Sequence, residues 1–324
     1  MVEAVAKNIY RIGVLLPGNP LKELNSYFIR GEERDLLIDT GFRCEACQKA
    51  LEDGLRELES DPEKRDVLAT HVHSDHSGMA DLFIGRGRKA YMGQIDLNYQ
   101  KATLYGKREK SWREQYIQEG FTAEEIQHIL ESNPAVTMAL PDVDDRFVGM
   151  KDQEIIEVGE YRLRLLLVPG HTPGNMMVWA EKQGILFSGD HVLFDISPNI
   201  TRWETSDDSL GDYIHSLEKY QKLPVKLTLP GHRKTGDYGK RVEELLNHHQ
   251  KRLKDTLRIV KENPGLTACD IAGKMTWKIR ARSWEEFPLV QKWFAVGECM
   301  SHLDYLKKRG LICRERGDKN WHYS

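Results

Sequence analysis

Four potential metal ligands lie within six residues of the sequence. His71, His73, Asp75 and His76 follow Asp66–Thr70, a mostly apolar run that is typical of a buried strand. Neutral imidazoles and carboxylates bind divalent ions such as zinc, and their clustering in one loop brings several lone pairs together at small entropic cost. His71 and His73 fall on one face of an extended segment, whereas Asp75 and His76 come after a bend. The pattern predicts a loop that serves two metal ions.

Three later turns each supply one more ligand after a predicted strand. His171 stands in Pro-Gly-His-Thr-Pro-Gly, Asp190 in Ser-Gly-Asp-His and His232 in Leu-Pro-Gly-His. The two oxygens of a carboxylate can each bind one ion, which makes Asp190 the natural bridge. The seven predicted ligands form two groups that share this carboxylate: His71, His73 and His171 for the first ion, Asp75, His76 and His232 for the second, and Asp190 for both. His191 is expected to face away from the ions.

Two divalent cations held in this way predict hydrolytic chemistry. Water between two cations loses its proton near neutral pH, so a metal-bridging hydroxide would attack a carbonyl or phosphorus centre. Asp75 is the predicted catalytic residue, because it could orient the hydroxide while it binds the second ion. Zinc is the expected ion, with iron or manganese as alternatives for the same ligands. Asp39 is either a hydrogen-bond partner of a ligand histidine or a residue of a strand-ending turn.

Composition excludes several classes of partner. The chain has 324 residues, a net charge of −3 and charges of both signs mixed along its length, which indicates no general affinity for nucleic acid or membrane. No run approaches the roughly 20 apolar residues of a membrane span. Five scattered cysteines are typical of a reducing compartment, and a cytoplasmic location is predicted. Cys44 and Cys47 form either a redox dithiol or, as we favour, two thiols packed under a helix.

The order of predicted elements indicates sheets with helices on their outer faces. Ile9–Leu16, Leu24–Arg30 and Asp35–Asp39 are separated by turn signals and read as an antiparallel meander. A helix over Glu45–Leu58 then leads to the strand that precedes the metal loop, and strands return after residue 153.

Two segments lie outside this pattern. Residues 93–145 are polar and helical, and they could form a lid over the metal loop with Tyr99, Tyr105 and Trp112 as substrate contacts. A packed helical hairpin and a dimer surface are the alternatives. Residues 241–324 form the second segment, in which three predicted helices and a terminal hairpin ending near Tyr323 resemble a winged helix.

The ordered ligand motifs, from His71 to His232, resemble those of the metallo-β-lactamase superfamily over residues 1–240. The resemblance implies an α+β fold: a four-layer αββα sandwich with a dinuclear site at one edge, a helical insertion at about residues 93–145 and a winged-helix-like domain at 241–324. Asp190 and the intact His76 resemble the glyoxalase II-like and lactonase branches. Lactamases of the common zinc class have Cys at the position of Asp190, which argues against β-lactam hydrolysis.

The expected function is therefore hydrolysis of a small-molecule thioester, ester or lactone. A nuclease that holds RNA or DNA with the winged helix is the alternative, because Arg280, Arg314 and Arg316 make that segment locally basic and Trp321 and Tyr323 could stack on bases. Acidic residues dilute this charge, so nucleic acid is the less favoured partner. An iron-based oxidoreductase or flavin-linked protein of the same fold is a third possibility, disfavoured because its flavodoxin-like extension is not visible. A homodimer is possible.

Overall fold

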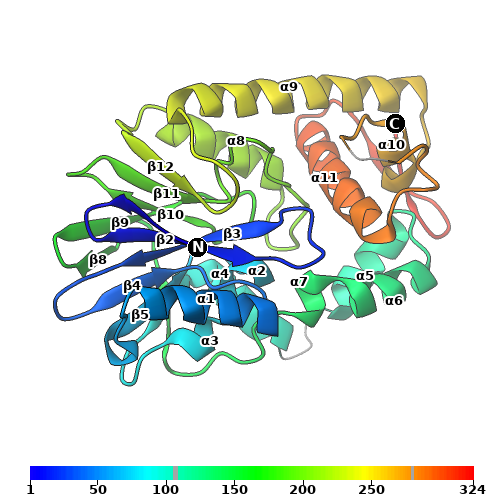
Figure 1. Cartoon of the computed structure of the whole chain (residues 1–324). Coiled ribbons are helices and arrows are strands. Elements are labelled where there is room, and N and C mark those ends of the chain that lie inside the picture. The colour runs from blue at the N-terminus through cyan, green and yellow to red at the C-terminus, as the bar shows by residue number, and fades with distance from the viewer. Residues whose placement is uncertain (105–108, 279–280) are drawn as a thin grey trace.

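The computed structural model describes residues 1–104, 109–278 and 281–324. Two β-sheets pack face to face, and helices cover the outer face of each sheet (Figure 1). This is the predicted α+β sandwich of four layers. Two residues singled out from the sequence, Tyr105 and Arg280, lie outside the described residues. None of the described helices combines the length and apolar character needed to cross a membrane.

The first sheet has seven strands that are hydrogen-bonded in chain order. They are β1 (Val2–Ala6), β2 (Ile9–Leu15), β3 (Glu23–Ile29), β4 (Asp35–Ile38), β5 (Arg65–Ala69), β6 (Ala90–Gly93) and β7 (Phe147–Met150). The pairs from β1 to β4 are antiparallel, which confirms the predicted meander, and the pairs from β4 to β7 are parallel. The sequence reading missed β1 and β7, both at the edges of the sheet.

The second sheet has five strands in the order β12-β11-β10-β9-β8. They are β8 (Ile155–Val158), β9 (Tyr161–Leu167), β10 (Met176–Ala180), β11 (Ile185–Gly189) and β12 (Leu227–Pro230). Only the β11–β12 pair of this sheet is parallel. An apolar layer between the two sheets, with Ile9, Ile29 and Ile38 from the first and Leu163 and Val178 from the second, is almost completely buried and holds them together.

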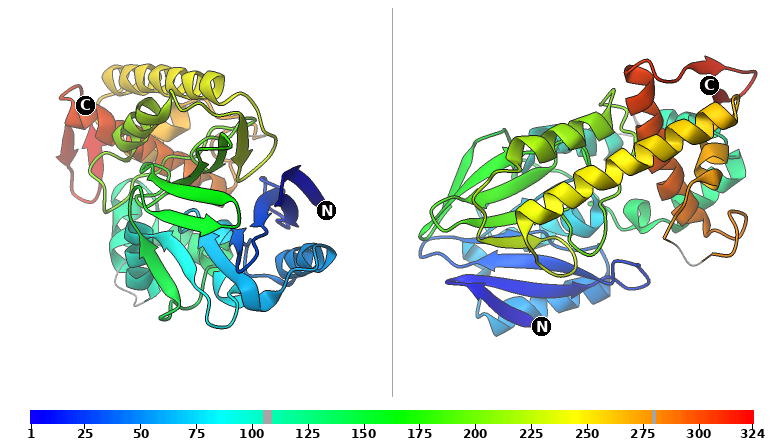
Figure 2. Two further views of the ribbon diagram at one scale, coloured as in Figure 1. Left: turned by 90° about the vertical axis from the view of Figure 1, so that its left-hand side faces the viewer. Right: turned by 90° about the horizontal axis from the view of Figure 1, so that it is seen from above.

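Helices cover both outer faces. On the first sheet, apolar side chains of α1 (Glu45–Glu57), α3 (Ala80–Phe83) and α4 (Gln94–Leu104) enter one core cluster with the strands. The short α2 (Ser74–Ser77) lies in the metal loop, and a 3-10 turn, η1 (Pro62–Lys64), precedes β5. On the second sheet lie α8 (Ser209–Tyr220) and the long α9 (Tyr238–Glu262). Seen from above, α9 runs from the sandwich to the C-terminal elements (Figure 2).

The insertion and the C-terminal segment pack together. The insertion continues as α5 (Glu109–Gln118), α6 (Ala123–Ser132) and α7 (Pro134–Thr137), and the C-terminal segment as α10 (Ala268–Lys274), α11 (Leu289–Lys308), β13 (Arg314–Arg316) and β14 (Trp321–Tyr323). Thr122 forms a capping box with Glu125, and Thr267 forms one with Asp270. The ring of Trp112 lies 5.5 Å from that of Trp293 on α11, so the insertion is a packed helical layer against this helix.

The C-terminal helices and antiparallel hairpin follow the predicted order, with Arg314 opposite Tyr323. The expectation that Tyr323 could stack on bases is wrong. Its side chain is fully buried and its hydroxyl donates a hydrogen bond to Glu119 at 2.9 Å. Arg202 joins the same cluster, with contacts to Glu119, Tyr323 and Asp304 of α11. This buried ionic cluster ties the loop before α8 to the insertion and to the C-terminal segment.

The Cys-x-x-Cys pair is a packing feature. Cys47 is buried, and its thiol donates to the carbonyl of Leu15 at 3.0 Å. Burial, assisted by the neighbouring Cys44 thiol, raises the pKa of Cys47 to about 12, so it stays protonated near neutral pH. All five cysteines of the chain are free thiols.

Candidate metal centre

The seven predicted ligands come together at one edge of the sandwich. They lie in the loops that follow β5, β9, β11 and β12, as the sequence indicates, and two of them, Asp75 and His76, belong to the short helix α2 in the first of these loops. The side chains form three overlapping groups, and within each group the potential donor atoms lie within 4.8 Å of one another: His71, His73 and His171; His71, His76 and Asp190; and Asp75, His76 and His232. Groups of three donors at this separation can hold a divalent cation.

The first group consists of histidines alone. Nε2 of His71 and Nδ1 of His73 are 3.0 Å apart, and the ring of His171 lies 4.8 Å from His71 and 4.6 Å from His73 between ring centres. Three imidazoles that converge on one point from two loops match the donor set of a catalytic zinc site.

The second group adds a carboxylate. Nε2 of His76 and Nε2 of His232 are 3.2 Å apart, and Oδ2 of Asp75 lies 3.3 Å from Nε2 of His232. Two ring nitrogens and one carboxylate oxygen therefore face the same point, a short distance from the first group.

Asp190 lies between the two groups. Its Oδ1 is 3.5 Å from Nε2 of His76, and its Oδ2 is 3.5 Å from Nε2 of His232 and 3.9 Å from Nε2 of His171. Oδ1 of Asp190 and Nε2 of His171 are buried and make no hydrogen bond among the described residues. Buried polar atoms without partners are costly, so a donor set of this kind fits a bound cation.

The electrostatics of the site favour neutral imidazoles in the first group. Burial and the neighbouring histidines lower the pKa of His71 well below its ordinary value. For the same reasons, the pKa of His73 falls to about 3, and burial lowers that of His171 as well. Near neutral pH these three rings keep the lone pairs that a metal ion needs.

The carboxylates make the second group attractive to positive charge. Burial would raise the pKa of Asp75, but His76 and His232 bring it to about 2. Burial is likewise outweighed at Asp190, where His232 and His76 hold the pKa far below its usual range. Conversely, burial lowers the pKa of His76, but Asp39 and Asp190 raise it well above its ordinary value. Both carboxylates are therefore ionised near neutral pH, and their negative charge would stabilise a bound cation.

A second layer of hydrogen bonds orients the rings. Oδ2 of Asp39 lies 2.7 Å from Nδ1 of His76, so of the two roles considered for this residue the structure shows the hydrogen bond to a proposed ligand. Asp39 also accepts from the amide and hydroxyl of Thr70, and its φ of +61° shows that its backbone is held in an uncommon conformation. Carbonyl oxygens of Asn199 and Glu23 lie 2.8 Å from Nδ1 of His171 and of His232. These contacts leave Nε2 of each ring free to face the centre.

Asp96, at the start of α4, is a site residue that the sequence analysis missed. It is fully buried, and its carboxylate accepts hydrogen bonds from Val72, Thr172 and Gly174. These residues belong to the two loops that carry His71, His73 and His171. No local motif marks Asp96, because its partners are distant in the sequence.

A glycine is required beside the bridging carboxylate. A Cβ atom at Gly231 would lie 2.5 Å from Oδ1 of Asp190 and 2.8 Å from Cε1 of His76. Such distances are too short for any side chain, so the Pro-Gly-His turn needs glycine for the close approach of two ligands.

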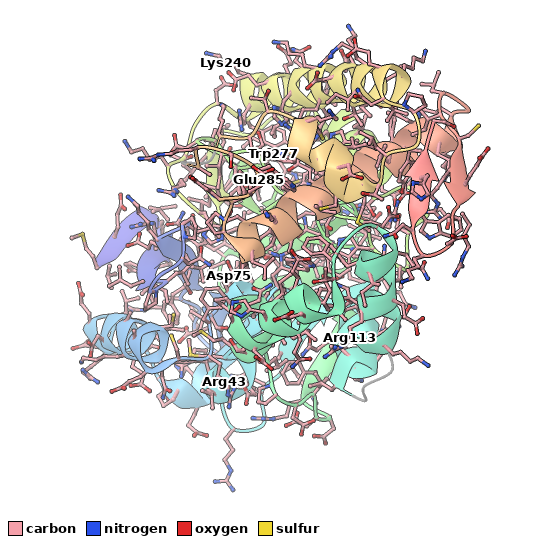
Figure 3. All side chains as sticks on the ribbon, turned by 90° about the vertical axis from the view of Figure 1, so that its right-hand side faces the viewer. Arg43, Asp75, Arg113, Lys240, Trp277 and Glu285 are labelled. Carbon is pink, nitrogen blue, oxygen red and sulfur yellow. The ribbon has the colours of Figure 1, made fainter. Side chains whose placement is uncertain are left out.

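Aromatic side chains border the histidines of the first group. The ring of Trp203 stacks on His73 at 5.9 Å between centres, and Tyr99 meets Trp203 edge-on at 4.9 Å. Tyr99 thus lies one ring away from a predicted ligand, whereas Trp112 packs against α11. Viewed onto this edge, Asp75 lies between the N-terminal strands, the insertion helices and the C-terminal segment (Figure 3).

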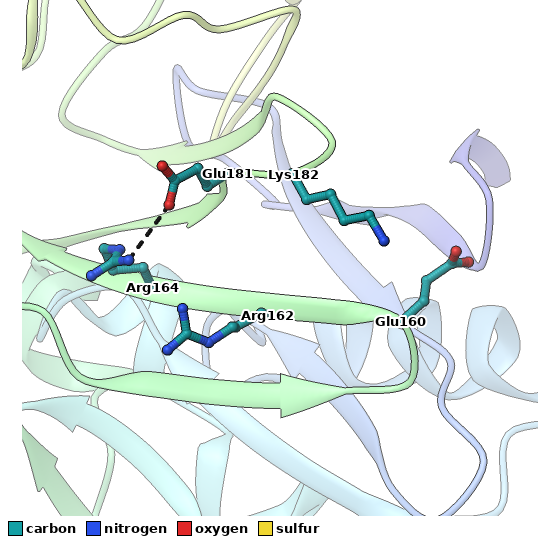
Figure 4. Close-up of a pocket in the computed structure, with 5 residues that line it drawn as sticks. All are labelled: Glu160, Arg162, Arg164, Glu181 and Lys182. Carbon is teal, nitrogen blue, oxygen red and sulfur yellow. Dashed lines mark hydrogen bonds and ion pairs between the residues drawn. The ribbon is translucent and has the colours of Figure 1, made fainter.

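A separate groove lies on the second sheet, away from these ligands. Glu160, Arg162, Arg164, Glu181 and Lys182 line it, and Arg164 pairs with Glu181 at 3.5 Å (Figure 4). Its side chains project from β9 and adjacent turns into solvent, and exposed ion pairs of this kind contribute little to stability.

Comparison with known proteins agrees with the geometry. The family model described as "Metallo-beta-lactamase superfamily" matches residues 23–232, a range that contains all seven predicted ligands. The human "Acyl-coenzyme A thioesterase MBLAC2" is 28% identical over 228 residues, which cover 64% of this chain and 72% of that protein. "Probable metallo-hydrolase YqjP" of Bacillus subtilis is 24% identical over 314 residues, 88% of each chain.

A solved structure extends the likeness beyond the matched domain. The metallo-beta-lactamase family protein TTHA1429 from Thermus thermophilus superposes with a TM-score of 0.80, is 28% identical and aligns over 99% of both chains, so the C-terminal elements are included. With this fold, the match over residues 23–232 and the His and Asp groups able to hold metal, the chain belongs to the metallo-β-lactamase superfamily and is a metallo-hydrolase.

Proposed function

We propose that the protein is a dinuclear metal-dependent hydrolase of small-molecule thioesters, with acyl-coenzyme A as the leading substrate class. The observation that carries the proposal is the position of Asp190, whose carboxylate lies close to His171 of the first group and to His76 and His232 of the second. A carboxylate placed between two donor groups supports two cations that share it. Zinc is the proposed ion, and iron or manganese would fit the same donors.

When bound, a pair of divalent cations supplies the acidity that generates hydroxide from water near neutral pH and polarises a carbonyl group. The side chains of the protein hold the cations and orient the reacting groups. Asp75, ionised near neutral pH and within 3.3 Å of Nε2 of His232, can hold a cation and accept a hydrogen bond from the attacking hydroxide. Asp39, Asn199 and Glu23 fix the ring orientations, so little reorganisation is needed during the reaction.

A thioester suits this set of residues for a chemical reason. A thiol has a pKa near 8.5, so a thiolate leaves without a proton donor, whereas an alkoxide or amine needs one. All seven side chains of the centre are proposed as ligands and none is reserved as a proton donor. The similarity to the human thioesterase supports the same class.

Nuclease activity is less well supported. The guanidinium carbons of Arg314 and Arg316 lie 4.3 and 5.5 Å from the centre of the Trp321 ring, and Tyr323 is fully buried. Arg314 also faces Glu119 at 3.7 Å. Within the part of the chain that the structure describes, these residues therefore already have partners in the protein.

The test is a parallel assay of acyl-coenzyme A thioesters, simple esters, lactones, phosphodiesters and single-stranded RNA, with metal analysis of the same preparation. We expect close to two ions per chain and thioester turnover that is lost in Asp75→Ala. Turnover should be kept in Asp53→Ala, a matched change at a half-exposed residue of α1 that pairs with Lys49 and Arg56 of the same helix. RNA cleavage that disappears with Asp75→Ala, without thioester turnover, would refute the proposal.

We also propose a cytoplasmic location. The five free thiols support it, since such thiols persist in a reducing compartment.

A further inference from the structure

A five-residue segment of the loop between β11 and α8 contacts the metal centre through Asn199 and Trp203, and α11 through Asn199, Ile200 and Arg202. We call residues 199–203 the bridging segment. It lies within the matched family domain, whereas α11 begins at Leu289 and lies outside it. In Figure 1, α11 stands between α9 and the insertion helices, on the side of the sandwich where the loops meet the C-terminal elements.

On the side of the metal centre, the bridging segment holds His171 at two points. The carbonyl of Asn199 lies 2.8 Å from Nδ1 of the His171 ring, and Nε1 of Trp203 donates to the His171 carbonyl at 2.9 Å. Trp203 also stacks on His73. The segment thus fixes both the ring and the backbone of one proposed ligand and packs against another.

On the other side, the bridging segment follows one face of α11. The side-chain amide of Asn199 donates to the carbonyl of Phe294 and to Oε2 of Glu298, both at 3.3 Å. The hydroxyl of Ser301 donates to the carbonyl of Ile200 at 2.5 Å. Phe294, Glu298 and Ser301 are three or four residues apart, so they share a face of the helix.

The approach of the helix is close enough to require glycine. A Cβ atom at Gly297 would lie 2.3 Å from Oγ1 of Thr201 and 2.8 Å from the hydroxyl of Tyr116. The amide of Arg202 donates to the carbonyl of Gly297 at 3.3 Å. The segment and α11 are therefore in direct backbone contact, and a small displacement of the helix must move the segment.

Glu298 is itself fixed by the helix that links the two parts of the chain. Its Oε1 lies 2.8 Å from Nε of Arg252 on α9, and each side chain is only 14% exposed. Burial raises the pKa of Glu298, while Arg252 and Asn199 oppose this effect. A carboxylate held between an arginine and an amide has little freedom, so it meets the side chain of Asn199 in one defined position.

We propose that Asn199 and Glu298 are positioning residues that make α11 part of the first metal site. Docking of α11 sets the orientation of His171 through the bridging segment and thereby the affinity of the cation that His71, His73 and His171 hold. The inference rests on the proposed dinuclear centre and extends it to residues outside the matched domain. It predicts that the two cations respond differently when the contact with α11 is removed.

The test uses the full-length apoprotein, Co²⁺ as the probe ion and a competing chelator to measure the affinity of each equivalent. Asn199→Ala removes the link to Glu298 but keeps the carbonyl that His171 uses, and Glu298→Gln keeps the shape of the side chain but removes its charge. Glu262→Gln, in an exposed ion pair with Arg258 on α9, is the matched control. We expect one equivalent to bind about 10- to 100-fold more weakly in the first two variants. The other equivalent should be unchanged. The melting temperature of the apoprotein should be unchanged in Asn199→Ala, whereas Glu298→Gln should lower it because the largely buried Arg252 loses its charged partner.

Wild-type affinity for both equivalents in Asn199→Ala and Glu298→Gln would overturn the proposal. So would an equal loss at both equivalents together with a lower apoprotein melting temperature in Asn199→Ala, because that is the signature of a contact that only stabilises the fold. A wild-type protein that binds two Co²⁺ ions but cleaves no thioester would refute the proposed substrate and leave this comparison intact.

Discussion

The carboxylate of Asp96 accepts a hydrogen bond from the hydroxyl of Thr172 at 2.6 Å. The same carboxylate accepts from the amide of Val72 at 2.9 Å and from that of Gly174 at 2.6 Å. One buried side chain thus joins the loop of His71 and His73 to the loop of His171. Burial raises its pKa to about 6, although the three hydrogen bonds lower it.

Replacing Asp96 by Asn should weaken metal binding about 10- to 100-fold. The amide of Asn has one acceptor atom where the carboxylate has two, and its NH₂ group would face a hydrogen-bond donor of one of the two loops. Chelator competition measures the change, and Asp142→Asn on the exposed surface is the control. Unchanged affinity in Asp96→Asn would show that the two loops hold their positions without it.

Asp190 and His73 should differ in how many ions they control. Asp190→Ala should lose both ions, because its two oxygens face both donor groups, whereas His73→Ala should remove mainly the ion of the first group. Elemental analysis after gel filtration gives the number of ions per chain. Retention of two ions in Asp190→Ala would exclude a shared carboxylate.

Gly231→Ala should disable the centre without touching any proposed ligand. The added methyl group would lie 2.5 Å from Oδ1 of Asp190, so Asp190 or the turn must move. We expect loss of metal and of hydrolysis. Gly239→Ala is the matched control, since a Cβ there would meet its nearest atom at 3.8 Å. If both variants keep wild-type metal content, the turn has more room than the structure shows.

Arg202→Met should lower the free energy of unfolding by about 3–5 kcal/mol, because Glu119 would remain buried without its nearest cation. Arg202 is 8% exposed and Glu119 is fully buried, so solvent cannot replace the interaction. Urea denaturation measures the change. Arg258→Met, which breaks exposed pairs on α9, should leave the midpoint nearly unchanged. A similar midpoint in the two variants would contradict a structural role for the ionic cluster.

His302 should make the fold sensitive to acid. Burial, with Arg252 nearby, lowers the pKa of His302 from 6.5 to about 3, so between these values the unfolded chain binds a proton that the folded chain does not. The free energy of unfolding therefore falls as the pH drops through this window, by about 1.4 kcal/mol per pH unit for one histidine. His302→Gln should reduce the slope of apoprotein stability against pH by that amount. An unchanged slope would show that His302 is not the group whose protonation in the unfolded chain causes the loss of stability.

The ligand turns were predictable because each is a local pattern, a β-rich run followed by a Gly, Pro or Asp turn with a histidine or carboxylate. Helix limits were predictable for the same reason, as at Thr122 and Thr267, whose capping residues lie three positions apart. Asp96, Asn199 and Arg202 could not be found in this way. Their roles depend on partners 24 to 121 residues distant, which only the packing of the chain brings together.

Local sequence patterns also failed to reveal the edge strands of the first sheet. β1 and β7 carry alternating or short apolar patterns that resemble many loops, and they are recognisable as strands only by their pairing with β2 and β6. The helical character of the insertion was predictable from local patterns. Its packing against α11 was not, since Trp112 and Trp293 are far apart in the sequence.

The largest apolar cluster includes Leu217 of α8, Tyr116 of the insertion, Leu253 of α9, Leu303 of α11 and Tyr323 of the last strand. Because residues on both sides of position 240 share this interior, the C-terminal segment is not a separable appendage. Its deletion would expose apolar side chains of α8 to solvent and create a surface that is prone to aggregation. Exchanging it between relatives during evolution would demand compensating changes in residues 1–240, so the two parts are expected to have diverged together.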